Sequence, residues 1–393
     1  MSTQLNTDEI IPLSEPHLSG KEWKYIKDCL DTNWVSYLGH YVDRFEMNMK
    51  KVVHAKYAVA TQSGTAALHI SLIIAGVKPE EEVIVPAITF VAPANAVRYC
   101  GAWPLFIDIN KNNWQIDINK LSDFLKKNTY FKNSYLYNKS TKRRIAALLP
   151  VHLLGGMFDP EALGSIAEMY NLPIIEDAAE SLGATFQEKA IAAPLTSSNP
   201  PVRFIVTSFN GNKIITTGGG GMIFTDNYEL YKMAKHLTTT AKVDSLTFFH
   251  DQVGYNYRMT NIAAAMGVAQ LEKLMEYVNT KRSIAKRYKM AFENLSKIVT
   301  HREPINCKST FWLYTIMLDQ NALSIIKELN KKKIMVRPIW TPPYRLPYLS
   351  NDSFAYKCEF SEFFYEHALC LPSSVGLTEK MQEKVIDTLS VYI

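Results

Sequence analysis

The chain has 393 residues, of which 47% are hydrophobic and 21% charged, and its formal net charge is +5; these values are ordinary for a globular protein with a large core. The mild charge does not indicate a nucleic-acid-binding protein, no apolar run reaches the roughly 18 residues of a membrane span, and the polar start is not typical of a signal or transit peptide. Five scattered cysteines without a CxxC pair favour reduced thiols, so we expect no disulfide, no metal site and a cytoplasmic location.

From residue 57 onward, short apolar runs alternate with helical segments. Gly76 and Gly101 are placed to end the first two helices, and Asp159 is placed to cap a third. Alternation of this kind predicts an α/β fold, in which helices cover both faces of a mostly parallel sheet. The expected strands are 57–62, 82–86, 104–109, 144–150, 173–178, 203–209 and 220–225, and the helices among them are 63–76, 92–101 and 161–172.

One connection differs from this pattern. Only about ten residues separate the strands 203–209 and 220–225, which is too few for a helical crossover, so we expect these strands to be antiparallel neighbours. Two other stretches are typical of surface insertions: residues 125–144 are polar and basic, and residues 188–202 are rich in proline and serine.

The domain organisation follows from a long helical pattern over residues 262–295. Its polar C-terminal half is expected to bridge to a second domain. We therefore predict a large domain over residues 1–255, followed by this connecting helix and a small α+β domain within residues 256–393.

Lys213 stands five residues ahead of four consecutive glycines, 218–221. A phosphate-binding P-loop has its glycines before the lysine, so this motif is excluded. The spacing of a dinucleotide-binding fingerprint also fails, because Ile223 occupies the place of its last glycine. A lone lysine is most often a solvated charge, but adjacent glycines allow the backbone to pass close to a bulky group.

Other polar residues follow strands that should end at the same edge of the sheet. Ser63, Gly64 and Thr65 open a helix, Asp177 ends one strand and Ser208 ends another. Ligands of open α/β sheets bind beyond the carboxyl ends of the strands. Each residue has a simpler reading, because Ser63 or Asp177 could only cap the next segment. Together, however, a helix N-terminus, a carboxylate, a hydroxyl and an amine predict a binding crevice.

Pyridoxal phosphate (PLP) is the ligand that needs this whole set of groups. Its aldehyde requires a lysine amine, and its ring acts as an electron sink. A carboxylate beside the ring nitrogen keeps that nitrogen protonated, and a helix N-terminus suits the phosphate. Phe90 could supply a flat partner for the ring.

The sequence resembles the PLP-dependent sugar aminotransferases of the DegT/DnrJ/EryC/StrS type, which have the aspartate aminotransferase fold (fold type I). The resemblance runs through most of the chain, and within the family it is nearest to the legionaminic-acid-pathway branch. Its densest stretches are SGTAALH, VPAITFVAPANAV, PVHLLG, IIEDAAESLGA, SFNGNKIITTGGGGM and VGYNYRMTNIAAAMGVAQLEKL.

This resemblance implies a role for each matching position. Lys213 matches the catalytic lysine, which bonds to the cofactor and then moves a proton. Asp177 matches the partner of the pyridine nitrogen, and Glu180 stands near the phenolic oxygen. The phosphate-binding positions are Gly64, Thr65 and Ser208, while Phe90 matches the aromatic residue that stacks on the ring. Asn256 matches an asparagine that reaches the phosphate from a second subunit, which implies a homodimer.

The implied reaction transfers an amino group from glutamate to the 4-keto carbon of a UDP- or GDP-linked 4-keto-6-deoxy hexose, for surface glycan or nonulosonic acid biosynthesis. Trp34 and Arg258 are candidate sugar-nucleotide contacts, and His152 is interpreted as a structural residue. Two stretches depart from the family's pattern: the long 188–202 loop, and RPIWTPPYRLPYL (337–349), which lacks a Leu-His pair.

Three other functions fit the sequence less well. A PLP-dependent sugar dehydratase of the same family would carry histidine in place of Lys213. A PLP-binding regulator without turnover would carry a DNA-binding segment, and none is recognisable. An NAD-dependent sugar enzyme would need a glycine-rich turn between a strand and a helix, and QSGTA (62–66) is too short for one.

Overall fold

The computed structural model describes residues 10–197, 200–244 and 246–393. The polar start at residues 1–9 and two positions of the predicted 188–202 loop therefore lie outside the described residues. Among the residues that are described, no helix is both long and apolar enough to span a bilayer. The helices are α1 (Glu22–Asp31), α2 (His40–Val53), α3 (Gly64–Ile74), α4 (Val91–Tyr99), α5 (Ile118–Asn128), α6 (Pro160–Tyr170), α7 (Tyr228–Thr238), α8 (Asn261–Leu271), α9 (Leu274–Phe292), α10 (Leu323–Lys331), α11 (Glu359–His367) and α12 (Glu379–Ser390), with short 3₁₀ turns η1 (Leu153–Gly155) and η2 (Pro343–Arg345).

Eight strands form the central sheet, in the order β1-β11-β10-β7-β6-β2-β3-β16. β11 runs antiparallel to both of its neighbours, and the other pairs are parallel. The predicted α/β class and the predicted antiparallel pair are thus confirmed. These strands are β1 (Tyr57–Thr61), β2 (Glu82–Pro86), β3 (Trp103–Ile107), β6 (Ile145–Leu148), β7 (Ile174–Asp177), β10 (Arg203–Ser208), β11 (Gly221–Thr225) and β16 (Phe354–Tyr356).

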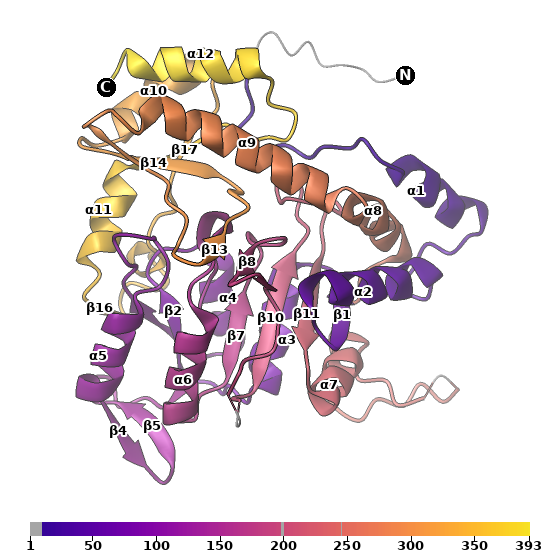
Figure 1. Ribbon diagram of the computed structural model, residues 1–393. Helices are drawn as coiled ribbons and strands as arrows, with labels where there is room; N and C mark the ends of the chain where they lie inside the picture. Colours follow the sequence, from indigo (N-terminus) through magenta and orange to yellow (C-terminus); the bar gives the residue numbers. More distant parts are fainter. Residues whose placement is uncertain (1–9, 198–199, 245) are drawn as a thin grey trace.

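Helices cover both faces of this sheet (Figure 1), and β2 shows why the strands of the sheet contain consecutive apolar residues. Val83 and Val85 point into one core, whereas Ile84 points into another that also contains Phe124 of α5 and Leu163 of α6. Successive side chains of a strand face opposite sides, so a strand covered on both sides needs apolar residues in sequence.

A smaller sheet in the C-terminal part has the order β12-β14-β17-β15 and packs against α9, α10 and α12. The same part of the chain returns to the large sheet through β16, which pairs with β3. The division at residues 255 and 256 stays a prediction. The strands of the smaller sheets are β12 (Ile298–Thr300), β14 (Tyr314–Leu318), β15 (Arg337–Pro338), β17 (Ala368–Leu371), β8 (Thr185–Phe186), β9 (Lys189–Ala190), β13 (Cys307–Lys308), β4 (Thr129–Lys132) and β5 (Tyr135–Asn138).

The single helix expected over 262–295 is wrong, because two helices, α8 and α9, meet at Glu272 and Lys273. No glycine or proline marks the break. Tertiary contacts account for it: Glu272 accepts a hydrogen bond from the Tyr25 hydroxyl (2.8 Å) and pairs with Lys21 (3.0 Å). These contacts hold the end of α8 against α1, while α9 continues over the smaller sheet (Figure 1).

Candidate functional site

A cavity of about 260 Å³ lies beyond the carboxyl ends of the parallel strands. Because β7 and β10 are parallel neighbours, the residues that end them meet at one edge of the sheet. The cavity is lined by eight of the predicted residues, Ser63, Gly64, Thr65, Phe90, Asp177, Glu180, Ser208 and Lys213. The structure therefore gathers side chains from four distant segments, as the sequence predicted.

The N-terminus of α3 opens into this cavity. Ser63 caps the helix by accepting a hydrogen bond from the N–H of Ala66 (3.0 Å), and the N–H groups of a first turn are available to an anion. Glycine is required where this turn meets the sheet, since a Cβ on Gly221 would lie 2.5 Å from the nitrogen of Gly64. A Cβ on Gly64 would in turn lie 2.9 Å from the Cβ of Ser208.

Asp177 is buried at the end of β7. Its Oδ1 accepts a hydrogen bond from the N–H of Ala179 (2.9 Å). Burial raises the pKa of Asp177, while that hydrogen bond and the charge of Lys213 act in the opposite direction. A buried carboxylate that faces a cavity is suited to pair with a cationic ring nitrogen.

Lys213 and Glu180 face each other across the cavity, with 3.6 Å between Nζ and Oε1. The other oxygen of Glu180 accepts a hydrogen bond from the N–H of Leu154 (2.7 Å). Burial raises the pKa of Glu180 to about 7, although Lys213 and that N–H favour its charged form. An amine beside a carboxyl that titrates near neutrality can exchange a proton with it.

Glu176, one residue before Asp177, points away from the cavity and toward Arg203 and His152. Its carboxylate contacts Nε of Arg203 and lies 2.9 Å from Nε2 of His152. Burial alone would raise the pKa of Glu176, but Arg203 and His152 stabilise the charged form and lower it to about 2. His152 also stacks on Phe158 at 4.0 Å between ring centroids. These contacts agree with a structural role for His152.

The sequence did not reveal three residues of the cavity wall, Thr89, Trp312 and Trp340. Within the described part of the chain, the buried Oγ1 of Thr89 has no hydrogen-bond partner. Nζ of Lys213 lies over the ring of Trp312, at 3.9 Å from the ring centroid. Thr89 is next to Phe90, so its position could have been inferred. Trp312 comes from a segment without a motif, and only the fold brings it to the cavity.

The remaining predicted residues do not line the cavity of a single chain. Trp34 is about half exposed, and Asn256 is exposed in the segment that follows α7. Arg258 faces Glu46, with 4.0 Å between Nη2 and Oε1. The binding roles of these three residues stay predictions.

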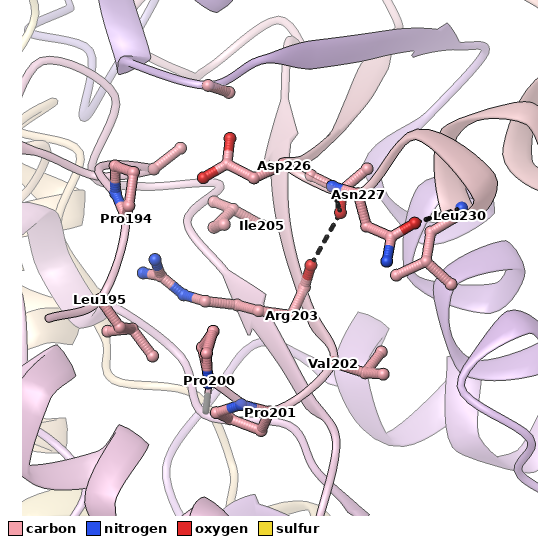
Figure 2. Close-up of a pocket in the computed structure, with 13 residues that line it drawn as sticks. Pro194, Leu195, Pro200, Pro201, Val202, Arg203, Ile205, Asp226, Asn227 and Leu230 are labelled. Atoms are coloured by element: carbon pink, nitrogen blue, oxygen red, sulfur yellow. Dashed lines mark hydrogen bonds between the residues drawn. The ribbon is translucent and has the colours of Figure 1, made fainter. Parts of the chain in front are cut away.

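A second cavity, of about 310 Å³, lies at the other end of β10. Residues within 192–195 and 200–202 and the start of α7 form its walls, and the side chains of Arg203 and Asp226 border it (Figure 2). It contains none of the predicted site residues. None of the described residues that line it carries an amine for covalent chemistry, whereas Lys213 lines the first cavity.

The first cavity fits PLP by the chemistry of its residues. Lys213 supplies an amine, Asp177 a buried carboxylate, and α3 an anion-binding N-terminus. Phe90 is exposed to 51% at the cavity, which leaves a ring face free for stacking. The unpartnered hydroxyl of Thr89 is a further group that a polar ligand could satisfy.

Comparisons with known proteins agree with this geometry. Residues 16–390 match the DegT/DnrJ/EryC1/StrS aminotransferase family, which is PLP-dependent. A GDP-perosamine synthase of Escherichia coli O157:H7 is 36% identical over 97% of this chain and 98% of its own length. Another GDP-perosamine synthase, from Caulobacter vibrioides, is 34% identical over 96% of this chain and 97% of its own.

A solved structure supports the fold. The aminotransferase TlmJ from Streptoalloteichus hindustanus superposes with a TM-score of 0.85, at 22% identity, over 97% of this chain and 98% of that protein. The match to the family covers nearly the whole chain, and the relatives are amino-sugar enzymes. This chain therefore belongs to the DegT/DnrJ/EryC1/StrS aminotransferase family and is a sugar aminotransferase.

Proposed function

We propose that this chain uses PLP to transfer an amino group from glutamate to the 4-keto carbon of a nucleotide-linked 4-keto-6-deoxy hexose. One observation carries the proposal: Lys213 and Asp177 face the same cavity as the N-terminus of α3. A GDP-linked sugar is the first choice, because a relative that is 36% identical over nearly the full length is a GDP-perosamine synthase. The similarity to the legionaminic-acid branch stays a prediction.

Each group of the cavity has a proposed task. Asp177 holds a proton at the pyridine nitrogen, Ser208 and the first turn of α3 bind the phosphate, and Phe90 packs against the ring. PLP, when bound, supplies the electron sink for cleavage of the bond to the departing hydrogen. The protein orients both reactants so that this hydrogen lies within reach of Lys213.

Lys213 moves the proton. As a free amine, its Nζ takes the proton from the α-carbon of glutamate and later delivers a proton to the sugar carbon that receives nitrogen. Glu180 lies 3.6 Å from Nζ, so it can share the proton that Nζ carries while each proton transfer is under way. A carboxyl that titrates near pH 7 is suited to this exchange.

We propose that the active unit is a homodimer in which Asn256 reaches the phosphate site of the partner subunit. Asn256 is exposed and lies outside the cavity of its own chain. The segment after α7 extends away from the body of the molecule (Figure 1), and a second copy could cover its exposed apolar side chains. These side chains are Val243, Leu246, Phe248, Phe249 and Val253.

The experiment is an amination assay with glutamate, PLP and matched panels of GDP- and UDP-linked 4-keto-6-deoxy hexoses, read by product mass. A product that carries nitrogen in place of the ketone oxygen, together with 2-oxoglutarate, is expected with a GDP sugar. Lys213→Ala is expected to abolish turnover and the visible absorbance of the bound cofactor. A wild-type chain that never takes up PLP would contradict the proposal.

A mixing experiment tests the dimer. Lys213→Ala and Asn256→Ala chains, each inactive alone, should regain activity when unfolded together and refolded, because a mixed dimer contains one complete site. Mixed dimers without regained activity would exclude a phosphate contact across the interface.

A further inference from the structure

Trp312 contacts Lys213 in two ways. Nζ of Lys213 lies 3.9 Å from the centroid of the indole ring, within the range of a cation–π interaction. The indole Nε1 donates a hydrogen bond to the backbone oxygen of Asn212 (2.7 Å). A single side chain thus contacts both the reactive amine and the backbone that carries it.

Trp312 is itself held firmly. Lys281 of α9 is buried and donates hydrogen bonds to the backbone oxygens of Trp312 (3.1 Å) and Ser373 (2.7 Å). Trp340 lies parallel to the indole, with 6.3 Å between ring centroids and an interplanar angle of 11°. The indole is 2% exposed, so its position is fixed before any ligand binds.

The geometry of Lys213 explains why such a contact is useful. Its amine must be free during each proton transfer, and a flexible lysine side chain has many rotamers. Glu180 attracts the amine from one side at 3.6 Å, and the indole face attracts it from another. Together they leave the amine in the cavity rather than in solvent.

We propose that Trp312 is a positioning residue, whose ring holds the amine of Lys213 in the cavity while that amine carries a proton and no covalent bond. Its use in catalysis rests on the proposed function, but the contact itself does not. Trp340 lines the same cavity, but the ring that lies under Nζ is that of Trp312, so Trp340 provides a matched control.

The test measures the reactivity of Lys213 in the cofactor-free chain with an acylating reagent such as acetic anhydride, quantified by peptide mass spectrometry at fixed pH. The indole face and Glu180 both attract the ammonium form, and only the free base is nucleophilic, so an amine held by both contacts reacts slowly. Trp312→Met or Trp312→Leu should raise the labelling rate of Lys213 by about threefold to tenfold. Trp312→Phe keeps an aromatic face and should stay within about twofold of the wild type.

Trp340→Leu enlarges the same cavity but leaves the indole of Trp312 held by its hydrogen bond to Asn212. The rate should therefore stay within about twofold of the wild type, which separates loss of the contact from easier access. An equal increase of the Lys213 labelling rate in Trp340→Leu and Trp312→Leu would overturn the proposal. A wild-type labelling rate in both Trp312→Met and Trp312→Leu would overturn it as well. Circular dichroism checks that each variant is folded. If only one of Trp312→Met and Trp312→Leu folds, that variant is enough for the comparison with the wild type. No sugar or amino donor enters this measurement, so a wrong substrate assignment cannot alter its result.

Discussion

The carboxyl group of Glu180 should make the stability of the cofactor-free chain depend on pH, and Glu180→Gln should remove that dependence. Burial raises its pKa from 4.5 to about 7. A group whose folded pKa is raised stabilises the protein fully below the unfolded pKa, and this stabilisation is lost as the pH rises through the folded pKa. Glu180 therefore favours folding at acidic pH and loses this contribution between about pH 4.5 and 7.

The size of the effect follows from the shift. One pKa unit corresponds to about 1.4 kcal/mol, so Glu180 alone should lower the free energy of unfolding by about 2 to 3 kcal/mol between pH 5 and pH 8. Glutamine stays neutral over this range, and its amide oxygen can still accept the N–H of Leu154 that Glu180 binds at 2.7 Å. Other titrating groups contribute almost equally to both chains and cancel in the difference.

Urea unfolding of both chains at pH 5 and pH 8 measures this difference. The wild type should lose about 2 to 3 kcal/mol more than Glu180→Gln over this interval. Glu188→Gln is the control, because Glu188 is exposed and its ion pair with Lys308 lies in solvent; it should follow the wild type. Parallel pH profiles of the wild type and Glu180→Gln would refute the reasoning.

Two further changes test the packing around the site. Gly221→Ala should destabilise the chain by about 1 to 3 kcal/mol and weaken PLP binding, because its Cβ would lie 2.5 Å from the first turn of α3; Gly211→Ala, where a Cβ meets nothing within 4 Å, should stay close to wild type in urea unfolding and cofactor titration. Arg203→Met leaves the buried Glu176 without its guanidinium and should cost about 3 to 5 kcal/mol in the same unfolding assay, whereas a loss below about 1 kcal/mol would show that His152 alone sustains that carboxylate.

Much of the large sheet could be predicted because its strands are covered on both faces. Such strands are continuous apolar runs, and helices with recognisable caps separate them. Asp159 illustrates this, since its carboxylate accepts hydrogen bonds from the N–H groups of Glu161 and Ala162 at the start of α6. The antiparallel β11 followed from loop length alone, because ten residues cannot make a parallel crossover.

Features that depend on long-range contacts could not be predicted in this way. The break between α8 and α9 has no local signal, because Glu272 is held by residues about 250 positions earlier. The same holds for β16, which is three residues long and becomes a strand only by pairing with β3. Helix and strand propensities describe a segment by itself. The α8–α9 break and β16, in contrast, depend on contacts with segments that are distant in the sequence.

The glycines after Lys213 show how a motif can be found for one reason and be needed for another. In the sequence they suggested close passage of the backbone to a bulky group, and Gly219 and Gly220 do line the cavity. Gly221, in contrast, packs against the backbone of Ser63 and Gly64. Because Gly221 has no Cβ, β11 can approach the first turn of α3 closely. That turn lines the same cavity as Lys213. The glycine therefore acts on the proposed phosphate site through the position of a helix. Gly221→Ala should accordingly weaken the binding of inorganic phosphate or PLP without changing the labelling rate of Lys213. If ligand affinity and labelling rate changed by the same factor, Gly221 would act on Lys213 as well as on the phosphate site, which would contradict this account.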